Sequence, residues 1–271
     1  MSRVGLFFIG LAAVSGVVPA APNPKEIVDK SVAATKTDWA EAGKYSFLEH
    51  DVEEKRQERH AKTYRVLMID GSPFNVVTAI DGHPLSGAEK AAEQRKLQRE
   101  IAKRQSESER ERDRRIAKYK RERDRDHRML QEMLNAFTFR LAGEAEVNGH
   151  DCLVLNAEPR PDFEPEDREG RVLKGMKGQL WIDKGTYQWV KVHAEVMRPV
   201  TFYGFLAKVG PGTEFDLEQE PVENGIWLPK SFHVRVRATA LGFFNENSDE
   251  SETYRDYQPM PQALARLEAG K

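Results

Sequence analysis

The sequence predicts an α+β protein built on an incomplete antiparallel β-barrel, a curled meander sheet, with an N-terminal helix and a long charged helical insertion. Three observations predict this fold class. Apolar and polar residues alternate with a period of two in many short segments, two-residue turn motifs separate these segments, and one long block without proline or glycine is more than half charged. Alternation of this kind is typical of antiparallel sheets, and sheets of many strands usually curl.

The first twenty residues have the pattern of a secretory signal peptide. A single basic residue, Arg3, precedes an apolar run from Val4 to Val18, and a small-residue motif follows it. A membrane anchor is the alternative, but the run is shorter than the roughly 20 residues that a spanning helix needs. We therefore expect cleavage before Ala21, a periplasmic protein, and a single domain over residues 21–271.

An N-terminal helix is expected to begin at Asn23-Pro24, which supplies an N-cap and a proline in the first turn. Apolar and small residues then recur at helical spacing from Ile27 to Thr35. After Gly43 the period changes to two, and the turn motifs Asp70-Gly71 and Asp81-Gly82 follow. The strands predicted here lie around Tyr45 and Phe47, from Tyr64 to Met68, and from Asn75 to Ile80.

The second half of the chain repeats the hairpin pattern, with turn motifs at Asn148-Gly149, Lys184-Gly185 and Asn224-Gly225. These motifs separate strands predicted at residues 140–147, 151–157, 179–183, 188–197, 213–222 and 226–240. Two of the strands have one clearly apolar face, formed by Val190, Val192, Ala194 and Val196 in one and by Phe232, Val234, Val236, Ala238 and Ala240 in the other. We expect these residues to line the concave side of the sheet, with His193 and His233 facing outward.

The charged insertion spans residues 86–137. Opposite charges four residues apart, such as Glu100 and Arg104, favour a helix. No large hydrophobic residue occurs from Ala102 to Arg115, so the middle is expected to be solvated or partly disordered rather than core. One helix and a helical hairpin are both compatible with the pattern. Apolar residues cluster at the two ends, at Leu97 and Ile101 and then at Leu130, Met133, Leu134 and Phe137, so the ends can dock on the sheet as a lid.

Charge and motifs argue against several classes of function. The formal net charge is −2, with 42 basic and 44 acidic side chains, which predicts no nucleic-acid partner. The seven histidines are scattered, and the chain contains no zinc, nucleophile-elbow, P-loop or Rossmann motif. We therefore expect no enzyme activity, no catalytic residues, no metal and no cofactor. The single cysteine, Cys152, lies in an apolar strand and is expected to be a buried packing residue.

The segments from Gly178 to Asp183 and from Glu223 to Pro229 read Gly-Gln-Leu-Trp-Ile-Asp and Glu-Asn-Gly-Ile-Trp-Leu-Pro. Together with residues 188–192, they resemble strand signatures of the bacterial outer-membrane lipoprotein-sorting (LolA/LolB-like) superfamily. The resemblance implies an incomplete antiparallel barrel that is closed by helices and holds acyl chains or other hydrophobic ligands on its concave side. The long charged insertion departs from the pattern of that family's carriers.

We thus expect a periplasmic carrier or sensor whose concave pocket binds a hydrophobic ligand, a lipid or the acyl chains of a lipoprotein. An envelope interaction or signalling module that uses the charged helix, with a protein partner or an anionic membrane surface, is the first alternative, and a hydrolase is the second. A filled core is equally compatible with the pattern. The predicted ligand-binding residues are Val190, Val192, Val196, Phe232, Val234, Val236, Leu130, Met133, Leu134 and Phe137.

Overall fold

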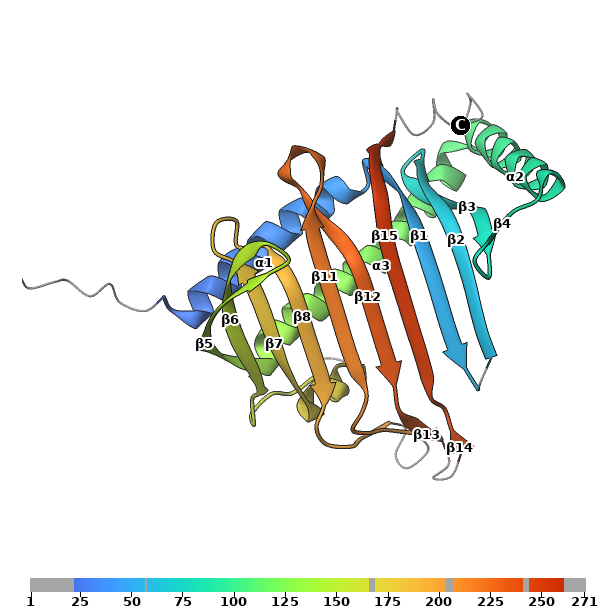
Figure 1. Cartoon of the computed structure of the whole chain (residues 1–271). Coiled ribbons are helices and arrows are strands. Elements are labelled where there is room, and N and C mark those ends of the chain that lie inside the picture. Colours follow the sequence, from blue (N-terminus) through green and yellow to red (C-terminus); the bar gives the residue numbers. More distant parts are fainter. Residues whose placement is uncertain (1–21, 57, 166–168, 203–206, 241–243, 261–271) are drawn as a thin grey trace, which may run out of the picture.

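The computed structural model describes residues 22–56, 58–165, 169–202, 207–240 and 244–260 (Figure 1). The expected signal peptide and its cleavage site lie outside the described residues. Three α-helices occur in the described part of the chain: α1 (Pro24–Ala42), α2 (Gly87–Gln105) and α3 (Glu109–Ala136). Two short 3-10 helices cover Glu169–Gly175 and Glu223–Gly225. None of these helices is apolar over a length that would cross a membrane.

The strands form one large antiparallel sheet and one small one. In the described residues, eleven strands pair in the order β4-β3-β2-β1-β15-β12-β11-β8-β7-β6-β5, and the large sheet does not close. These strands are β1 (Tyr45–Lys55), β2 (Glu58–Ile69), β3 (Ser72–Ile80), β4 (His83–Pro84), β5 (Phe137–Val147), β6 (His150–Pro159), β7 (Met176–Asp183), β8 (Trp189–Val196), β11 (Glu214–Pro221), β12 (Trp227–Val236) and β15 (Ser248–Pro259). The small sheet contains β9 (Val200–Phe202), β10 (Ala207–Val209), β13 (Ala238–Ala240) and β14 (Phe244–Asn245). The predicted fold class is confirmed.

The strand β15 joins the two halves of the chain into one sheet. It pairs with β1 on one side and with β12 on the other, so the last strand lies between the N-terminal and C-terminal meanders (Figure 1). The sequence of β15, Ser-Asp-Glu-Ser-Glu-Thr-Tyr-Arg-Asp-Tyr-Gln-Pro, contains no aliphatic side chain, and the hydropathy pattern did not predict it as a strand. Its position is set by backbone pairing with two neighbours rather than by an apolar face of its own.

Local sequence explains most of the turns and helix ends. Asn23 caps α1 by accepting a hydrogen bond from the backbone N–H of Lys25 at 3.0 Å, as predicted. Both residues of each Asp-Gly and Asn-Gly turn have positive φ angles, for example 52° at Asn148 and 82° at Gly149. This conformation matches the right-handed twist of a two-residue hairpin, and it is the reason why these dipeptides predicted the hairpins correctly.

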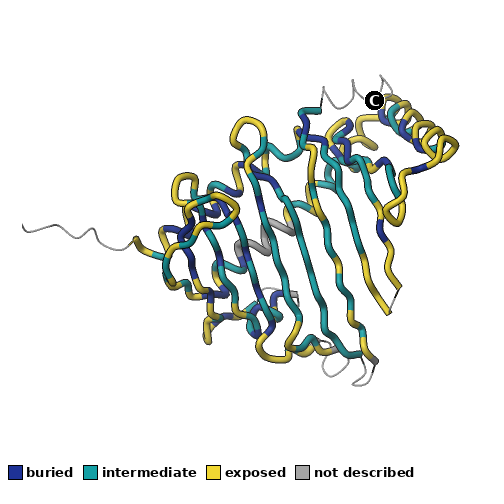
Figure 2. The backbone as a smooth tube through the Cα atoms, viewed as in Figure 1, coloured by how far each residue is buried: buried dark blue, intermediate teal, exposed yellow. Residues whose placement is uncertain are grey.

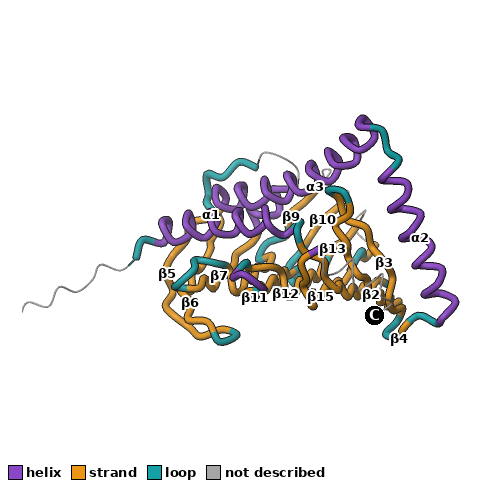
Figure 3. Tube along the Cα trace, turned by 90° about the horizontal axis from the view of Figure 1, so that it is seen from above, coloured by secondary structure: helices purple, strands orange, loops and turns teal. Residues whose placement is uncertain are grey.

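Two helices cover one face of the sheet. Figure 3 shows α1 and α3 side by side on this inner face. The main core lies under α1 and the end of α3, where helix residues such as Ile27 and Val28 pack on strands β5 to β8 through residues such as Leu155 and Ile182. Figure 2 shows buried residues gathered in this half, whereas β12, β15 and β1 are mostly half-buried. The inner face of the sheet is thus covered by a packed core at the β5–β8 end and is less covered at β12, β15 and β1.

The charged insertion consists of two helices, α2 and α3, which diverge from a short turn and lie on different parts of the sheet (Figure 3). Ser86 and Ser108 each form a capping box, with Glu89 and with Glu111, so a new helix starts at Ser108 in the middle of the charged run. The helix α3 crosses the inner face. The helix α2 lies at the β3–β4 edge, and Leu97 packs on the face of β2 that carries Leu67, opposite to Val66.

Most residues from 105 to 114 are exposed, as expected for the middle of the insertion, but two arginines beside this stretch fix it to the β2–β3 turn. Arg104 is 7% exposed, and its guanidinium donates to the carbonyl oxygens of Ile69 and Ser72 at 2.6 and 2.8 Å. Its Nε also forms the predicted ion pair with Glu100, at 2.8 Å. Arg115 donates to the carbonyl oxygen of Asp70 at 3.1 Å. The hydropathy pattern did not predict this contact, because it is made by hydrogen bonds from arginine side chains to backbone carbonyl oxygens and not by apolar residues.

We expect Arg104→Ala to lower the free energy of unfolding by about 2–3 kcal/mol, because hydrogen bonds from a buried charged group each contribute more than neutral ones. Urea denaturation followed by circular dichroism measures the change. Lys103→Ala is the matched control, since the side chain of Lys103 is 66% exposed and its ion pair with Glu100 spans 3.7 Å. Equal stability of the Arg104 variant and the control would show that the charged insertion does not depend on the contact of Arg104 with the β2–β3 turn.

Candidate functional site

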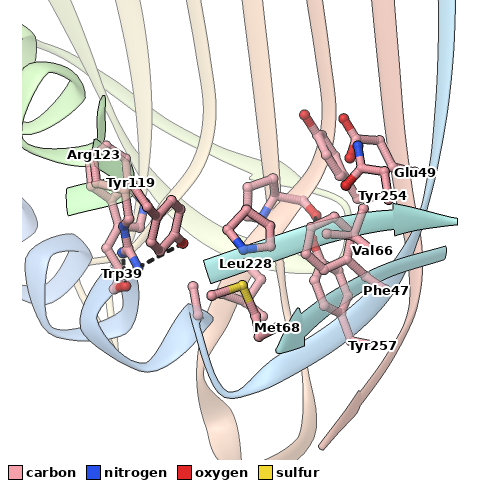
Figure 4. Close-up of a pocket in the computed structure, with 14 residues that line it drawn as sticks. Trp39, Phe47, Glu49, Val66, Met68, Tyr119, Arg123, Leu228, Tyr254 and Tyr257 are labelled. Carbon is pink, nitrogen blue, oxygen red and sulfur yellow. Dashed lines mark hydrogen bonds between the residues drawn. The ribbon is translucent and has the colours of Figure 1, made fainter. Parts of the chain in front are cut away.

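The described residues enclose a large pocket at the less covered end of the inner face, between the sheet and the helices α1 and α3 (Figure 4). Its volume is about 500 Å³. Strands β1, β2, β3, β12 and β15 form the floor, and the C-terminal part of α1 and the middle of α3 form the wall. The lining residues are Trp39, Ala42, Phe47, Glu49, Val66, Met68, Pro73, Asn75, Tyr119, Arg123, Leu228, Pro229, Tyr254 and Tyr257.

Three aromatic rings form one side of the pocket. The ring centroid of Phe47 lies 5.8 Å from that of Tyr254, edge to face, and 5.3 Å from that of Tyr257. The hydroxyl of Tyr257 donates to the carbonyl oxygen of Pro229 at 2.6 Å, which holds the ring against β12. Aromatic groups arranged in this way offer apolar area and a negative ring face to a ligand.

A bulge in β15 brings the two tyrosines to the same face. Tyr254 and Tyr257 are three residues apart, so a regular strand would point them to opposite sides of the sheet. Between the pairs Ser46–Gln258 and Leu48–Arg255, one residue of β1 faces two residues of β15, and Asp256 has a φ of 56°. The extra residue shifts the alternation of side chains between the two faces by one position, so both tyrosine rings point into the pocket.

A basic side chain lies at the helical wall. The guanidinium of Arg123 donates to the carbonyl oxygen of Trp39 and, at 3.4 Å, to the hydroxyl of Tyr119. It also lies 5.8 Å from the centroid of the Tyr119 ring. Figure 4 shows this group on one side of the pocket and Glu49 with Tyr254 on the other. The pocket therefore has a basic end at the helices and an acidic end at the sheet.

The acidic end contains three carboxyl groups on neighbouring strands. Glu49 and Asp51 follow the same face of β1, and Glu252 lies opposite Asp51 on β15. The hydroxyl of Tyr254 donates to Glu252. Burial, and then the charges of Asp51 and Glu252, raise the pKa of Glu49 to about 8. The pKa of Asp51 is raised for the same reasons, burial and the charge of Glu252.

The predicted ligand-binding residues do not line this pocket. Met133, Leu134, Phe137 and Val192 do come together, at the other end of the inner face, but the space that they share with the main core is only about 20 Å³. That volume is comparable to one water molecule. At this end of the sheet, the filled-core alternative describes the structure.

The remaining predicted residues are spread over the sheet. The prediction that Val190 shares a face with Val192 is wrong, because a bulge in β8 makes Val190 an extra residue there. Val190 packs with Cys152 and Trp227 in a separate small cluster, and Val196 is buried. Phe232 lies on the inner face, where its ring contacts Phe215 at 5.1 Å. Val234 and Val236 follow Phe232 along the same face of β12 and are half-buried, while the side chain of Leu130 lies outside the described part.

The pocket residues that sequence analysis missed fall into two groups. Phe47, Val66 and Met68 were assigned to strands, but their neighbours in space were unknown. Tyr254 and Tyr257 lie in a strand that the apolar pattern did not reveal. A pair of tyrosines in an otherwise polar segment was the one available signal, because large aromatic residues in a polar strand need a partner surface.

Polar groups elsewhere in the described residues do not suggest a metal or redox site. No group of three or more histidine, cysteine, aspartate or glutamate side chains in that part of the chain is arranged to hold a metal ion. His193 and His233 lie opposite the inner face, as predicted, and contact Asp216 and Asp249 at 2.9 and 2.6 Å. Cys152 is buried, and burial raises the pKa of its thiol to about 11, so the thiol stays protonated at neutral pH.

Comparison with known proteins gives matches to solved structures only. No family model and no curated protein matches the chain. A LolA superfamily protein from Nitrosomonas europaea matches with a TM-score of 0.32 and 9% identity, over 88% of this chain and 94% of the other. A DUF1329 family protein from Desulfovibrio piger matches with a TM-score of 0.33 and 13% identity, over 87% and 92%. A chain of the Pseudomonas aeruginosa MucA/MucB complex matches with a TM-score of 0.22 and 14% identity, over 86% and 99%.

Proposed function

We propose that the protein binds an amphipathic, lipid-like ligand in the pocket between α1, α3 and strands β1, β2, β12 and β15, and that it acts as a periplasmic carrier or sensor of that ligand. The observation that carries this proposal is the pocket itself. Its volume of about 500 Å³ is within the range of roughly 300–1,000 Å³ that is usual for small-molecule sites. Apolar and aromatic residues form most of its lining, with charged groups at two places only.

The shape of the sheet supports the same proposal. Beyond Leu228 and Pro229, which line the pocket, β12 continues with the half-buried Phe232, Val234 and Val236 on its inner face. We propose that these three residues extend the binding surface toward the middle of the sheet. A long apolar chain needs such an extended surface, whereas a compact polar ligand does not. The signal-peptide pattern of residues 1–20 supports a periplasmic location.

Filling the pocket tests the proposal. We expect Met68→Trp to weaken binding of an uncharged fluorescent probe with a long alkyl chain by about tenfold or more, because the indole would occupy the floor of the pocket. Fluorescence titration measures the dissociation constant. Met197→Trp is the matched control, since Met197 is 48% exposed and does not line the pocket. A wild-type protein that binds no such probe, or a Met68 variant that binds as wild type does, would contradict the proposed site.

The natural occupant can be sought directly. Native mass spectrometry of protein purified from its own periplasm, followed by solvent extraction, should show a bound lipid or lipid-like molecule. Recovery of a stoichiometric protein partner without any lipid would instead support the envelope interaction module.

A further inference from the structure

We propose that the pocket selects a cationic amphiphile, whose ammonium group lies against the rings of Phe47, Tyr254 and Tyr257 and beside the carboxylate of Glu49. This inference rests on the proposed function, because it names the headgroup of the ligand that the pocket would hold. It is carried by the juxtaposition, within one cavity, of an aromatic wall and an acidic side chain (Figure 4).

The aromatic wall suits a positive group. The ring centroids of Tyr254 and Tyr257 lie 5.8 and 5.3 Å from the centroid of Phe47, and all three rings line the pocket. A cation within about 6 Å of a ring centroid is attracted by the negative ring face, and clusters of such rings are the usual recognition element for quaternary ammonium groups. A purely hydrocarbon ligand would use the apolar area of the rings but not their electrostatics.

The charge balance at the sheet favours the same ligand. Within the described part of the chain, none of Glu49, Asp51 and Glu252 forms an ion pair, and one carboxylate oxygen of Asp51 is buried without a hydrogen-bond partner. Lys62, opposite Asp51 on β2, is exposed. Carboxylates in a protein interior are normally paired, since isolated buried charges are destabilising. In the free protein a proton on Glu49 relieves part of this repulsion, and a ligand ammonium group would replace that proton as the countercharge.

The basic end of the pocket does not compete for the same headgroup. The guanidinium of Arg123 already donates to the Trp39 carbonyl and the Tyr119 hydroxyl, and it lies across the pocket from Glu49 (Figure 4). Between the two ends lie the apolar side chains of Met68 and Leu228. The apolar chain of a cationic amphiphile would therefore run from Glu49 over these side chains toward the helices.

Three amphiphiles that share a dodecyl chain test the headgroup: dodecyltrimethylammonium, dodecyl maltoside and dodecanoate, each titrated by calorimetry below its micelle concentration. We expect the cationic probe to bind about tenfold more tightly than the neutral one, and dodecanoate to bind most weakly. In Glu49→Gln the preference for the cationic probe over the neutral one should fall to about threefold or less, the part that the aromatic rings supply. Glu54→Gln is the matched control, because Glu54 lies on the same strand, on its other face, and is exposed.

Proton release gives a second readout that needs no variant. The titratable groups that face Glu49 are Asp51 on β1, Tyr64 on β2, Glu252, Tyr254 and Tyr257 on β15, and Arg123 lies across the pocket. An ammonium group beside Glu49 stabilises its charged form, so binding at neutral pH should release up to about one proton. Titration in buffers of different ionisation enthalpy counts this proton, and the maltoside should release none.

The outcomes distinguish a failure of the proposed cationic headgroup from a failure of the proposed ligand pocket. Equal binding of all three probes, or tighter binding of dodecanoate, would overturn the cationic headgroup and leave the lipid-like pocket standing. Binding of none of the probes would overturn both. If Glu49→Gln does not fold, the order of the three affinities and the proton count in the wild-type protein still decide the question.

Discussion

Replacing Asp38 by alanine is expected to lower the free energy of unfolding by roughly 3–4 kcal/mol, one of the largest effects of any single substitution in this protein. Asp38 lies on α1 and is 8% exposed. Its Oδ2 atom accepts hydrogen bonds from the side-chain amide of Gln188 at 2.6 Å and from the backbone N–H of Trp227 at 2.7 Å. Alanine would leave both buried donors without a partner, and it would release the helix from β8 and β12.

Asp38→Asn separates hydrogen bonding from charge. Burial raises the pKa of Asp38, so the charged form gains little from this environment. The asparagine carbonyl oxygen can still accept both hydrogen bonds. We therefore expect this variant to lose less than about 1 kcal/mol, as measured by urea denaturation. Equal destabilisation by alanine and asparagine would show that the negative charge, and not the acceptor, holds α1 in place.

The second large effect is a pH dependence of stability that originates at Glu49. The pKa of Glu49 in the folded protein is about 8, well above its ordinary value of 4.5, so the folded state holds this proton more tightly than the unfolded state does. The tighter binding of this proton adds to the free energy of unfolding. The contribution is fully present below about pH 4.5 and is lost as the pH rises to about 8. Relative to the wild-type protein, Glu49→Gln should thus gain stability with rising pH. We expect the gain to reach about 2–3 kcal/mol, because the side chain is only partly buried and solvent screens the repulsion.

Denaturation of both proteins at a series of pH values between 4 and 9 measures this difference. Titrating groups far from Glu49 cancel in it, whereas Asp51, which interacts directly with Glu49, contributes to it. Glu54→Gln should show no such trend, since Glu54 is exposed on the opposite face of β1. A constant difference between Glu49→Gln and wild type at all pH values would mean that the carboxyl cluster does not hold a proton in the folded state. In that case three charged carboxylates would lie side by side on β1 and β15, and one of them, Glu49, would line the pocket.

Local patterns in the sequence were sufficient for most of the secondary structure. The period-two alternation predicted the strands of both meanders, because each of these strands has one face against the core. The Asp-Gly and Asn-Gly dipeptides predicted the hairpins, because few other residues tolerate two successive positive φ angles. The break between the two helices of the charged insertion was also encoded locally, in the capping box of Ser108 and Glu111, although hydropathy alone left open whether the insertion is one helix or two.

The candidate site could not be predicted in the same way. The predicted residues at Met133, Leu134, Phe137 and Val192 are apolar and lie on the inner face, but they fill one another's space. Whether apolar residues enclose a cavity depends on the separation of the elements that carry them. Hydropathy reports only that a side chain avoids water, so it does not distinguish the filled end of this sheet from the open one.

The sequence by itself determined the fold class, the order of the two meanders, the N-terminal helix and the turns that connect neighbouring strands. All of these depend on contacts between residues that are close along the chain. Only the tertiary structure decided that the polar strand β15 lies between β1 and β12, and that its bulge at Asp256 turns Tyr254 and Tyr257 toward Phe47 and Glu49. The physical reason is that the pairing of β15 with β1 joins residues about 200 positions apart. Backbone hydrogen bonding and burial across the whole sheet select them, and no short segment of sequence contains that information.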